Sequence, residues 1–139
     1  MNFQKYILCD DPVENILEEG QVTGFRLRMM QGAYKGTRLS YFQDIVVLAD
    51  GERFSLKEGT LTFTLASGSY RAEELSTCSW HRWNFCEKAL IVCRKPGGLA
   101  DGAHHIEAGY SCRDMFGPRG DGLTGGYRDI TMEGGREQC

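Results

Sequence analysis

An alternation of apolar and polar residues at positions 61–65 is the feature that most limits how this chain can fold. Leu61, Phe63 and Leu65 are apolar and alternate with Thr62 and Thr64. Because neighbouring side chains of a β-strand point to opposite faces of its sheet, this spacing predicts a half-buried strand. Residues 25–29 alternate in the same way, and apolar β-branched residues at 45–49 lead into Asp50-Gly51, a tight-turn signal.

Further strand patterns follow along the chain, at residues 54–56, 89–94, 103–113 and 127–132. Short strands separated by turn residues at this rate are typical of a sandwich or barrel. Helical character is weak: residues 72–75 can form one helical turn, and no other segment is convincingly helical, since Pro12 and Gly20 confine the faint helical pattern of residues 10–19. The 139 residues therefore predict one all-β domain over residues 1–139, an antiparallel β-sandwich of jelly-roll or immunoglobulin-like type.

The charge pattern gives no reason to expect a nucleic-acid partner or a membrane. Net charge is −3 and no long run of like charge occurs. The longest apolar run, at residues 45–49, is too short to cross a bilayer. The N-terminus lacks the basic-then-apolar layout of a signal peptide, so we expect a cytoplasmic protein. The six cysteines contain no CxxC pair, and we expect reduced thiols.

The stretch at residues 94–106 joins two expected strands and contains a histidine pair. Proline and glycines at 96–98, interpreted as turn formers, precede His104 and His105. Adjacent strand residues point to opposite faces, so the two histidines cannot chelate one metal together without a bulge. His105 shares a face with Glu107, as in an acid–base pair or an ordinary ion pair. We assign no catalytic residue and no metal ligand to this chain; a cupin-like metal site at His104 and His105 is the weaker alternative.

A glycine-rich segment at about residues 114–126 is the one long stretch without a regular pattern. Its five glycines and Pro118 disfavour helix and strand. It also carries Met115, Phe116 and Leu123, apolar residues that a purely solvated loop does not need. Long loops in compact domains are often functional, so we interpret the segment as an interface or lid, with a plain hairpin tip as the alternative.

Trp80 and Trp83, with Phe85, form an aromatic cluster before the strand at 89–94. Exposed tryptophans at this spacing could stack on sugar rings, which would make the chain a stand-alone carbohydrate-binding module. They could equally pack in the core or at an interface, and we favour packing.

A series of short motifs occurs in a fixed order between about residues 22 and 113. The series comprises Tyr34-Lys35-Gly36-Thr37-Arg38-Leu39-Ser40, Asp44-Ile45-Val46-Val47, Asp50-Gly51-Glu52, Ser69-Tyr70, Glu74-Leu75, Trp83 with Phe85, Lys95-Pro96-Gly97-Gly98-Leu99, Gly102 and His104. In this order the motifs resemble the small (β) subunit of bacterial C-glycoside deglycosidases. After its last long strand the family continues with Arg, a spacer and Ser-Tyr. Here Arg113 is followed by Asp114-Met115-Phe116-Gly117-Pro118, so this end departs from the family pattern.

The resemblance implies a subunit of a carbon–carbon lyase. In such enzymes a TIM-barrel α subunit binds a divalent metal, typically manganese (Mn2+), and supplies the catalytic groups, while the β-sandwich subunit joins it in an αβ hetero-oligomer. The substrate is a small molecule, a 3-keto C-glucoside of a flavonoid or related aromatic, cleaved by elimination. This chain itself would bind no cofactor and would stabilise the α subunit. The residues that we expect at the interface or the substrate entrance are Tyr34, Arg38, Trp83, His105, Arg113, Met115 and Phe116.

Overall fold

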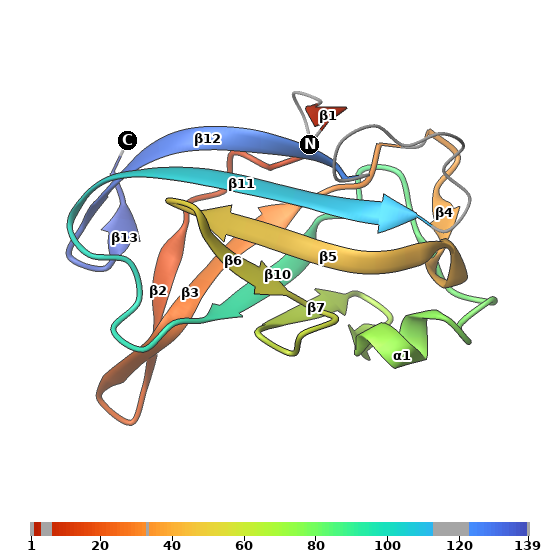
Figure 1. Cartoon of the computed structure of the whole chain (residues 1–139), viewed down its shortest axis with the longest axis horizontal. Coiled ribbons are helices and arrows are strands. Elements are labelled where there is room, and N and C mark those ends of the chain that lie inside the picture. Colours follow the sequence, from red (N-terminus) through yellow and green to blue (C-terminus); the bar gives the residue numbers. More distant parts are fainter. Residues whose placement is uncertain (1, 4–6, 33, 113–122, 139) are drawn as a thin grey trace.

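The computed structural model describes residues 2–3, 7–32, 34–112 and 123–138 (Figure 1). The strands are β1 (Asn2–Phe3), β2 (Glu14–Glu18), β3 (Gln21–Met29), β4 (Thr37–Arg38), β5 (Phe42–Ala49), β6 (Glu52–Ser55), β7 (Leu61–Leu65), β8 (Gly68–Tyr70), β9 (Arg82–Trp83), β10 (Ala89–Arg94), β11 (Gly102–Cys112), β12 (Thr124–Glu133) and β13 (Arg136–Glu137). Between them lie the 3-10 helix η1 (Leu39–Tyr41) and the single helical turn α1 (Ala72–Leu75). No helix within these ranges is long and apolar enough to cross a membrane. The predictions of an all-β fold and of a helical turn at 72–75 are confirmed.

One continuous sheet forms both layers of the structure. It contains 11 strands, in the order β6-β5-β11-β12-β13-β2-β3-β10-β7-β8 with β1 beside β12, and a separate two-stranded sheet pairs β4 with β9. Figure 1 shows β5, β11 and β12 in one layer, with β2, β3, β10 and β7 beneath them. The rings of Phe25 on β3 and Phe54 on β6 meet between the layers, with centroids 5.5 Å apart. The predicted antiparallel sandwich in a single domain is therefore confirmed.

Trp83 lies at the centre of the packing between the layers. Its side chain is fully buried, and its ring centroid is 5.3 Å from that of Phe42 on β5 and 5.1 Å from that of Phe63 on β7. The ring of Tyr110 on β11 closes the cluster at 5.8 Å. The indole N–H donates to the backbone carbonyl of Glu87 at 2.8 Å, so the burial leaves no unpaired donor. The cluster ties β9 to both layers.

Residues 10–19 contain a strand and no helix, despite the faint helical pattern in this part of the sequence. They contain β2, which forms an antiparallel hairpin with β3. The hairpin turns at Glu19 and Gly20, whose φ angles of 50° and 80° suit a two-residue turn. β2 also pairs with β13, and the Arg26 guanidinium lies 2.7 Å from the Glu14 carboxylate. Strand partners on both sides outweigh a faint local preference for helix.

The glycine-rich segment also ends earlier than predicted. Residues 124–126, expected to be part of the loop, are the first three residues of β12. Gly125 is paired with Gly109 of β11 on one side and with Phe3 of β1 on the other. Two neighbouring strands compensate for the weak strand preference of glycine, because ladder hydrogen bonds form on both sides. Residues 113–122 lie outside the described part of the chain, so the interface or lid role of that segment stays a prediction.

The connection between β10 and β11 rests on the β2–β3 hairpin. Asn15 of β2 donates through Nδ2 to the carbonyl of Leu99 at 2.9 Å, and its Oδ1 accepts from the Leu99 N–H at 2.9 Å. Gly98 has a φ of +63°, and a Cβ at this position would lie only 2.5 Å from Asn15 Oδ1 and 2.7 Å from Val22 Cγ1. Gly97, with a φ of +84°, has open space around it. The turn predicted at residues 96–98 therefore has two glycines with different physical requirements.

We predict that Gly98→Ala destabilises the fold more than Gly97→Ala. Both substitutions place a side chain at a positive φ, which costs about 1 kcal/mol or more. Gly98→Ala adds a steric conflict with the Asn15 clamp, worth roughly another 1–3 kcal/mol. Urea unfolding of the two variants measures the difference. Equal destabilisation would show that Asn15 moves aside at little cost, and would contradict the close contact as a constraint.

Candidate functional site

Strands β4 and β9 build one end of the sandwich, on the right in Figure 1 near η1 and α1. Their register pairs Thr37 with Trp83 and Arg38 with Arg82, and the Leu39 N–H donates to the His81 carbonyl at 3.0 Å. Because side chains alternate along β9, the inward position of Trp83 turns Arg82 outward. Arg38 and Arg82 are both exposed. This end therefore has a buried aromatic anchor beneath a cationic surface.

An exposed aromatic pair flanks these strands. Tyr34, just before β4, is 79% exposed, and Phe85, just after β9, is 47% exposed. Their ring centroids are 4.9 Å apart. Gly36 allows the two segments to approach, since a Cβ there would lie 3.2 Å from the Trp83 carbonyl oxygen. Large aromatic side chains exposed together on a surface are typical of contacts with another molecule.

The structure brings together only some of the predicted interface residues. Tyr34 and Arg38 share this end of the sandwich. Trp83 has no exposed surface, so its prediction as an interface or entrance residue is wrong: its ring fills the core. His105 lies on β11, in a different part of the sheet. Arg113, Met115 and Phe116, also predicted at the interface, lie outside the described residues.

The two tryptophans do not form a common platform. Trp80 is 79% exposed, whereas Trp83 is fully buried. A sugar-binding surface built from both rings is therefore contradicted, although packing in the core is correct for Trp83. The spacing in the sequence does not reveal which ring points inward, because the two residues belong partly to a loop.

The histidines of β11 make separate contacts. His105 Nδ1 lies 2.7 Å from Asp129 Oδ1, its cross-strand neighbour on β12, and its Nε2 lies 3.7 Å from Glu107 Oε2. His104 Nδ1 lies 2.5 Å from Asp50 Oδ2, and its Nε2 lies 2.6 Å from the Ala100 carbonyl. No group of three or more His, Cys, Asp or Glu side chains in the described ranges is placed to hold a metal. The geometry around His105 favours an ion pair on an exposed sheet face over a catalytic pair.

His104 joins the β10–β11 connection to the β5–β6 turn. Both of its ring nitrogens face acceptors, which only the protonated imidazolium can satisfy together. Partial burial lowers the pKa of His104, and nearby Lys95 does the same, but the hydrogen bonds with Asp50 and Ala100 outweigh them and raise the pKa above 6.5. The same hydrogen bond from His104, together with one from the His105 N–H, holds the pKa of Asp50 below 3.8.

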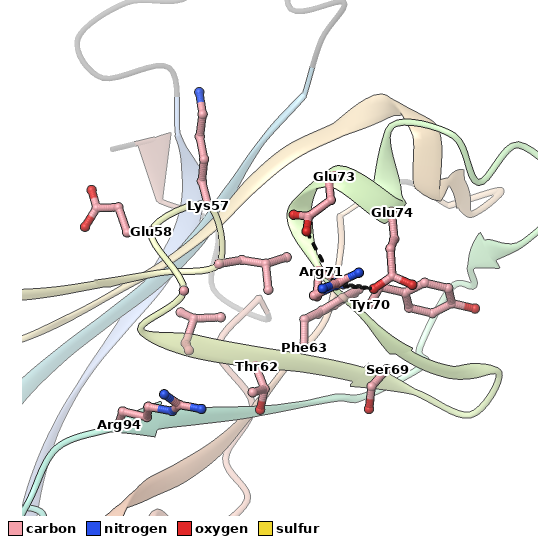
Figure 2. Close-up of a pocket in the computed structure, with 13 residues that line it drawn as sticks. Lys57, Glu58, Thr62, Phe63, Ser69, Tyr70, Arg71, Glu73, Glu74 and Arg94 are labelled. Carbon is pink, nitrogen blue, oxygen red and sulfur yellow. Dashed lines mark hydrogen bonds and ion pairs between the residues drawn. The ribbon is translucent and has the colours of Figure 1, made fainter.

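A cleft of about 440 Å³ opens where β8 ends the sheet (Figure 2). Its apolar floor includes Leu61, Phe63 and Tyr70. At its rim the Arg71 guanidinium lies 3.4 Å from Glu73 and 3.1 Å from Glu74, as the dashed lines in Figure 2 show. None of the predicted site residues lines it. No local pattern could have indicated this cleft, because its walls come from three separate segments of the chain.

We predict that the His104–Asp50 contact makes stability depend on pH with a defined sign. Because the pKa of His104 is raised in the folded state, its protonated side chain stabilises the fold below pH 6.5. This contribution is lost as the pH rises through the folded-state pKa. Because the pKa of Asp50 is lowered in the folded state, its ionised carboxylate stabilises the fold above pH 3.8. This contribution is lost as the pH falls through the folded-state pKa. Both contributions are therefore present between pH 3.8 and pH 6.5.

The test is urea unfolding of His104→Ala across this range and above it. The variant should lose about 1 kcal/mol near pH 5.5, a modest value because Asp50 is half-exposed, and much less above about pH 8. His81→Ala serves as the control, because His81 is an exposed histidine without a carboxylate partner in the described residues. A loss for His104→Ala that does not change with pH would contradict the protonated contact.

Comparison with known proteins relates most of the chain to one family. The family model for the C-glycoside deglycosidase beta subunit matches residues 3–116. A C-glycoside deglycosidase beta subunit from Eubacterium cellulosolvens is 25% identical over 99 residues, which cover 71% of this chain and 66% of that protein. The chain thus spans just under two thirds of the length of the relative that it matches. The motifs that set the β4–β9 end, the β5–β6 turn and the β10–β11 connection all fall inside the matched region, and the chain belongs to the C-glycoside deglycosidase beta subunit family.

Proposed function

We propose that this chain is the accessory β subunit of a C-glycoside deglycosidase and that the catalytic centre lies on a TIM-barrel α subunit. The match of residues 3–116 to the beta subunit family carries this proposal. A beta subunit implies a partner, and the exposed pair of Tyr34 and Phe85 with the nearby Arg38 offers a surface of the composition that protein interfaces favour.

The proposed reaction of the complex is a carbon–carbon lyase reaction on a 3-keto C-glucoside of a flavonoid or related aromatic. The ketone at C3 acidifies the proton at C2, and a base on the α subunit removes it. The electron pair left at C2 then expels the aglycone from C1, so the C1–C bond breaks as a C1–C2 double bond forms, and the aglycone carbon that receives the bonding pair takes up a proton from an acid on the α subunit. A divalent metal such as manganese, held by residues of the α subunit, would supply Lewis-acid stabilisation of negative charge.

The role proposed for this chain is structural support of that partner. Trp83 and its aromatic neighbours hold the β4–β9 end rigid, so the side chains above them are presented without a large loss of conformational entropy on binding. Arg38 lies in a paired strand and is exposed. An arginine of this kind can form bidentate hydrogen bonds with a carboxylate of a partner.

Co-expression tests the proposed division of labour. The purified chain alone, supplied with manganese, should not cleave a 3-keto C-glucoside, whereas the chain co-purified with its TIM-barrel subunit should. The large subunit alone is the control and should be less active or less stable than the complex. Liquid chromatography of the released aglycone measures turnover. Cleavage by the small chain alone would overturn the accessory role.

A second prediction concerns the contact surface. Truncating both exposed rings in a Tyr34→Ala, Phe85→Ala double variant should weaken association with the large subunit by about tenfold or more, because aromatic anchors carry much of an interface's binding energy. Leu17→Ala, at a 68% exposed apolar residue on β2, is the matched control and should bind normally. Isothermal calorimetry measures the dissociation constants. Equal affinity of the double variant and the wild type would place the interface elsewhere.

A further inference from the structure

A second cleft, of about 340 Å³, lies between the β7–β8 turn and the segment that carries β9. Ala66 and Ser67 form one wall, and Trp80, Arg82 and Asn84 contribute to the other. Its volume falls in the range of roughly 300–1,000 Å³ that is usual for small-molecule sites. It is separate from the cleft of Figure 2, with which it shares no lining residue.

The walls of this cleft are held in place by Glu87. One carboxylate oxygen accepts from the Ala66 N–H at 3.1 Å, and the other accepts from the backbone N–H and side-chain amide of Asn84 at 3.1 and 3.2 Å. The Glu87 carbonyl in turn accepts from the buried Trp83 indole at 2.8 Å. The β7–β8 turn and the loop after β9 are thereby fixed to each other and to the core. A ligand would meet a site that is already formed.

The cleft also presents polar groups that the fold itself does not use. The side chains of Arg82 and His81 are exposed and make no hydrogen bond or ion pair within the described part of the chain. The Trp80 indole N–H likewise has no partner there, and its ring is 79% exposed. A large aromatic face beside several donors that have no partner within the described residues can bind a ligand that offers both an apolar face and hydrogen-bonding groups.

The balance of charge indicates the kind of ligand. Among the residues that line the cleft, Arg82 and Glu87 contribute opposite charges, so the formal charges of the lining itself cancel. Hydrogen-bond donors and acceptors are both available, as a polyhydroxylated molecule requires. The weakly positive C–H face of a pyranose ring suits the negative face of an indole.

We propose that this cleft binds a neutral hexopyranose, with the sugar ring stacked on Trp80 and its hydroxyl groups bonded to Arg82 and Asn84. The site replaces the two-tryptophan platform that the burial of Trp83 excludes. It belongs to this chain and does not depend on the activity proposed for the complex. Sugar binding here and turnover by the co-purified complex can therefore succeed or fail independently.

The experiment titrates methyl β-D-glucopyranoside into the full-length chain and follows the two indole N–H signals by 15N-correlated NMR. The Trp80 signal should shift and then saturate as sugar is added, with a dissociation constant on the order of 1 mM or weaker, as expected for a single shallow site. The signal of the buried Trp83 should stay unchanged. Mannitol, an open-chain polyol without a ring face, should not bind. Binding of mannitol with equal affinity would overturn the stacking geometry.

Variants separate this site from the partner surface. Trp80→Ala should weaken sugar binding by about tenfold or more, whereas Trp80→Phe, which keeps an aromatic face, should weaken it less. Phe85→Ala is the matched control, because Phe85 is an exposed ring outside the cleft, and it should bind the sugar like wild type. Equal sugar affinity of Trp80→Ala and wild type would overturn the proposal. So would a Trp80 signal that responds to the large subunit but to none of the sugar concentrations.

Discussion

The packing of Trp83 between the two layers is the contact on which the β4–β9 end of the structure depends. Its ring touches residues of β5, β7 and β11, so one side chain joins strands from opposite parts of the curled sheet. Because Trp83 points inward, its strand neighbour Arg82 must point outward. Its hydrogen bond to Glu87 also fixes the loop that forms one wall of a cleft. The exposure of Arg82 and the position of this loop therefore both follow from the burial of Trp83.

Hydrogen bonds from polar side chains hold two of the connections between strands in place. The buried Asp44 carboxylate accepts from the Ser55 hydroxyl at 2.8 Å and from the Lys57 N–H at 2.9 Å, which holds the turn after β6 against β5. Asn15 binds both backbone groups of Leu99 in the connection before β11. A buried acceptor that is fully hydrogen-bonded rigidifies its surroundings, and an unpaired one would be costly. These contacts hold the turn after β6 and the β10–β11 connection in defined conformations.

The sequence predicted much of the fold and less of the candidate sites. Alternation at residues 61–65 and the apolar pattern at 89–94 predicted β7 and β10 with their observed bounds, and adjacency on β11 correctly separated the contacts of His104 and His105. Residues 124–126 were wrongly assigned to the loop, and the strand at 14–18 was not predicted, because strand partners on both sides override a weak local preference. The partner of His104 was missed, although Asp50 was recognised as a turn residue. Nothing in the spacing of the two residues indicates that the turn folds back onto β11.

Strand content, the sandwich class and the family are properties that the chain reveals along its length, because alternation, turn residues and ordered motifs are all local patterns. Which side chains share a surface is a different matter. Tyr34 meets Phe85, and Trp80 lines a cleft while Trp83 is buried, only because β4 pairs with β9 and the sheet folds over them. Such pairings join distant segments, and the free energy that selects them comes from burying the whole core at once. Local sequence therefore determines the elements, and only the tertiary structure decides which of their side chains can act together.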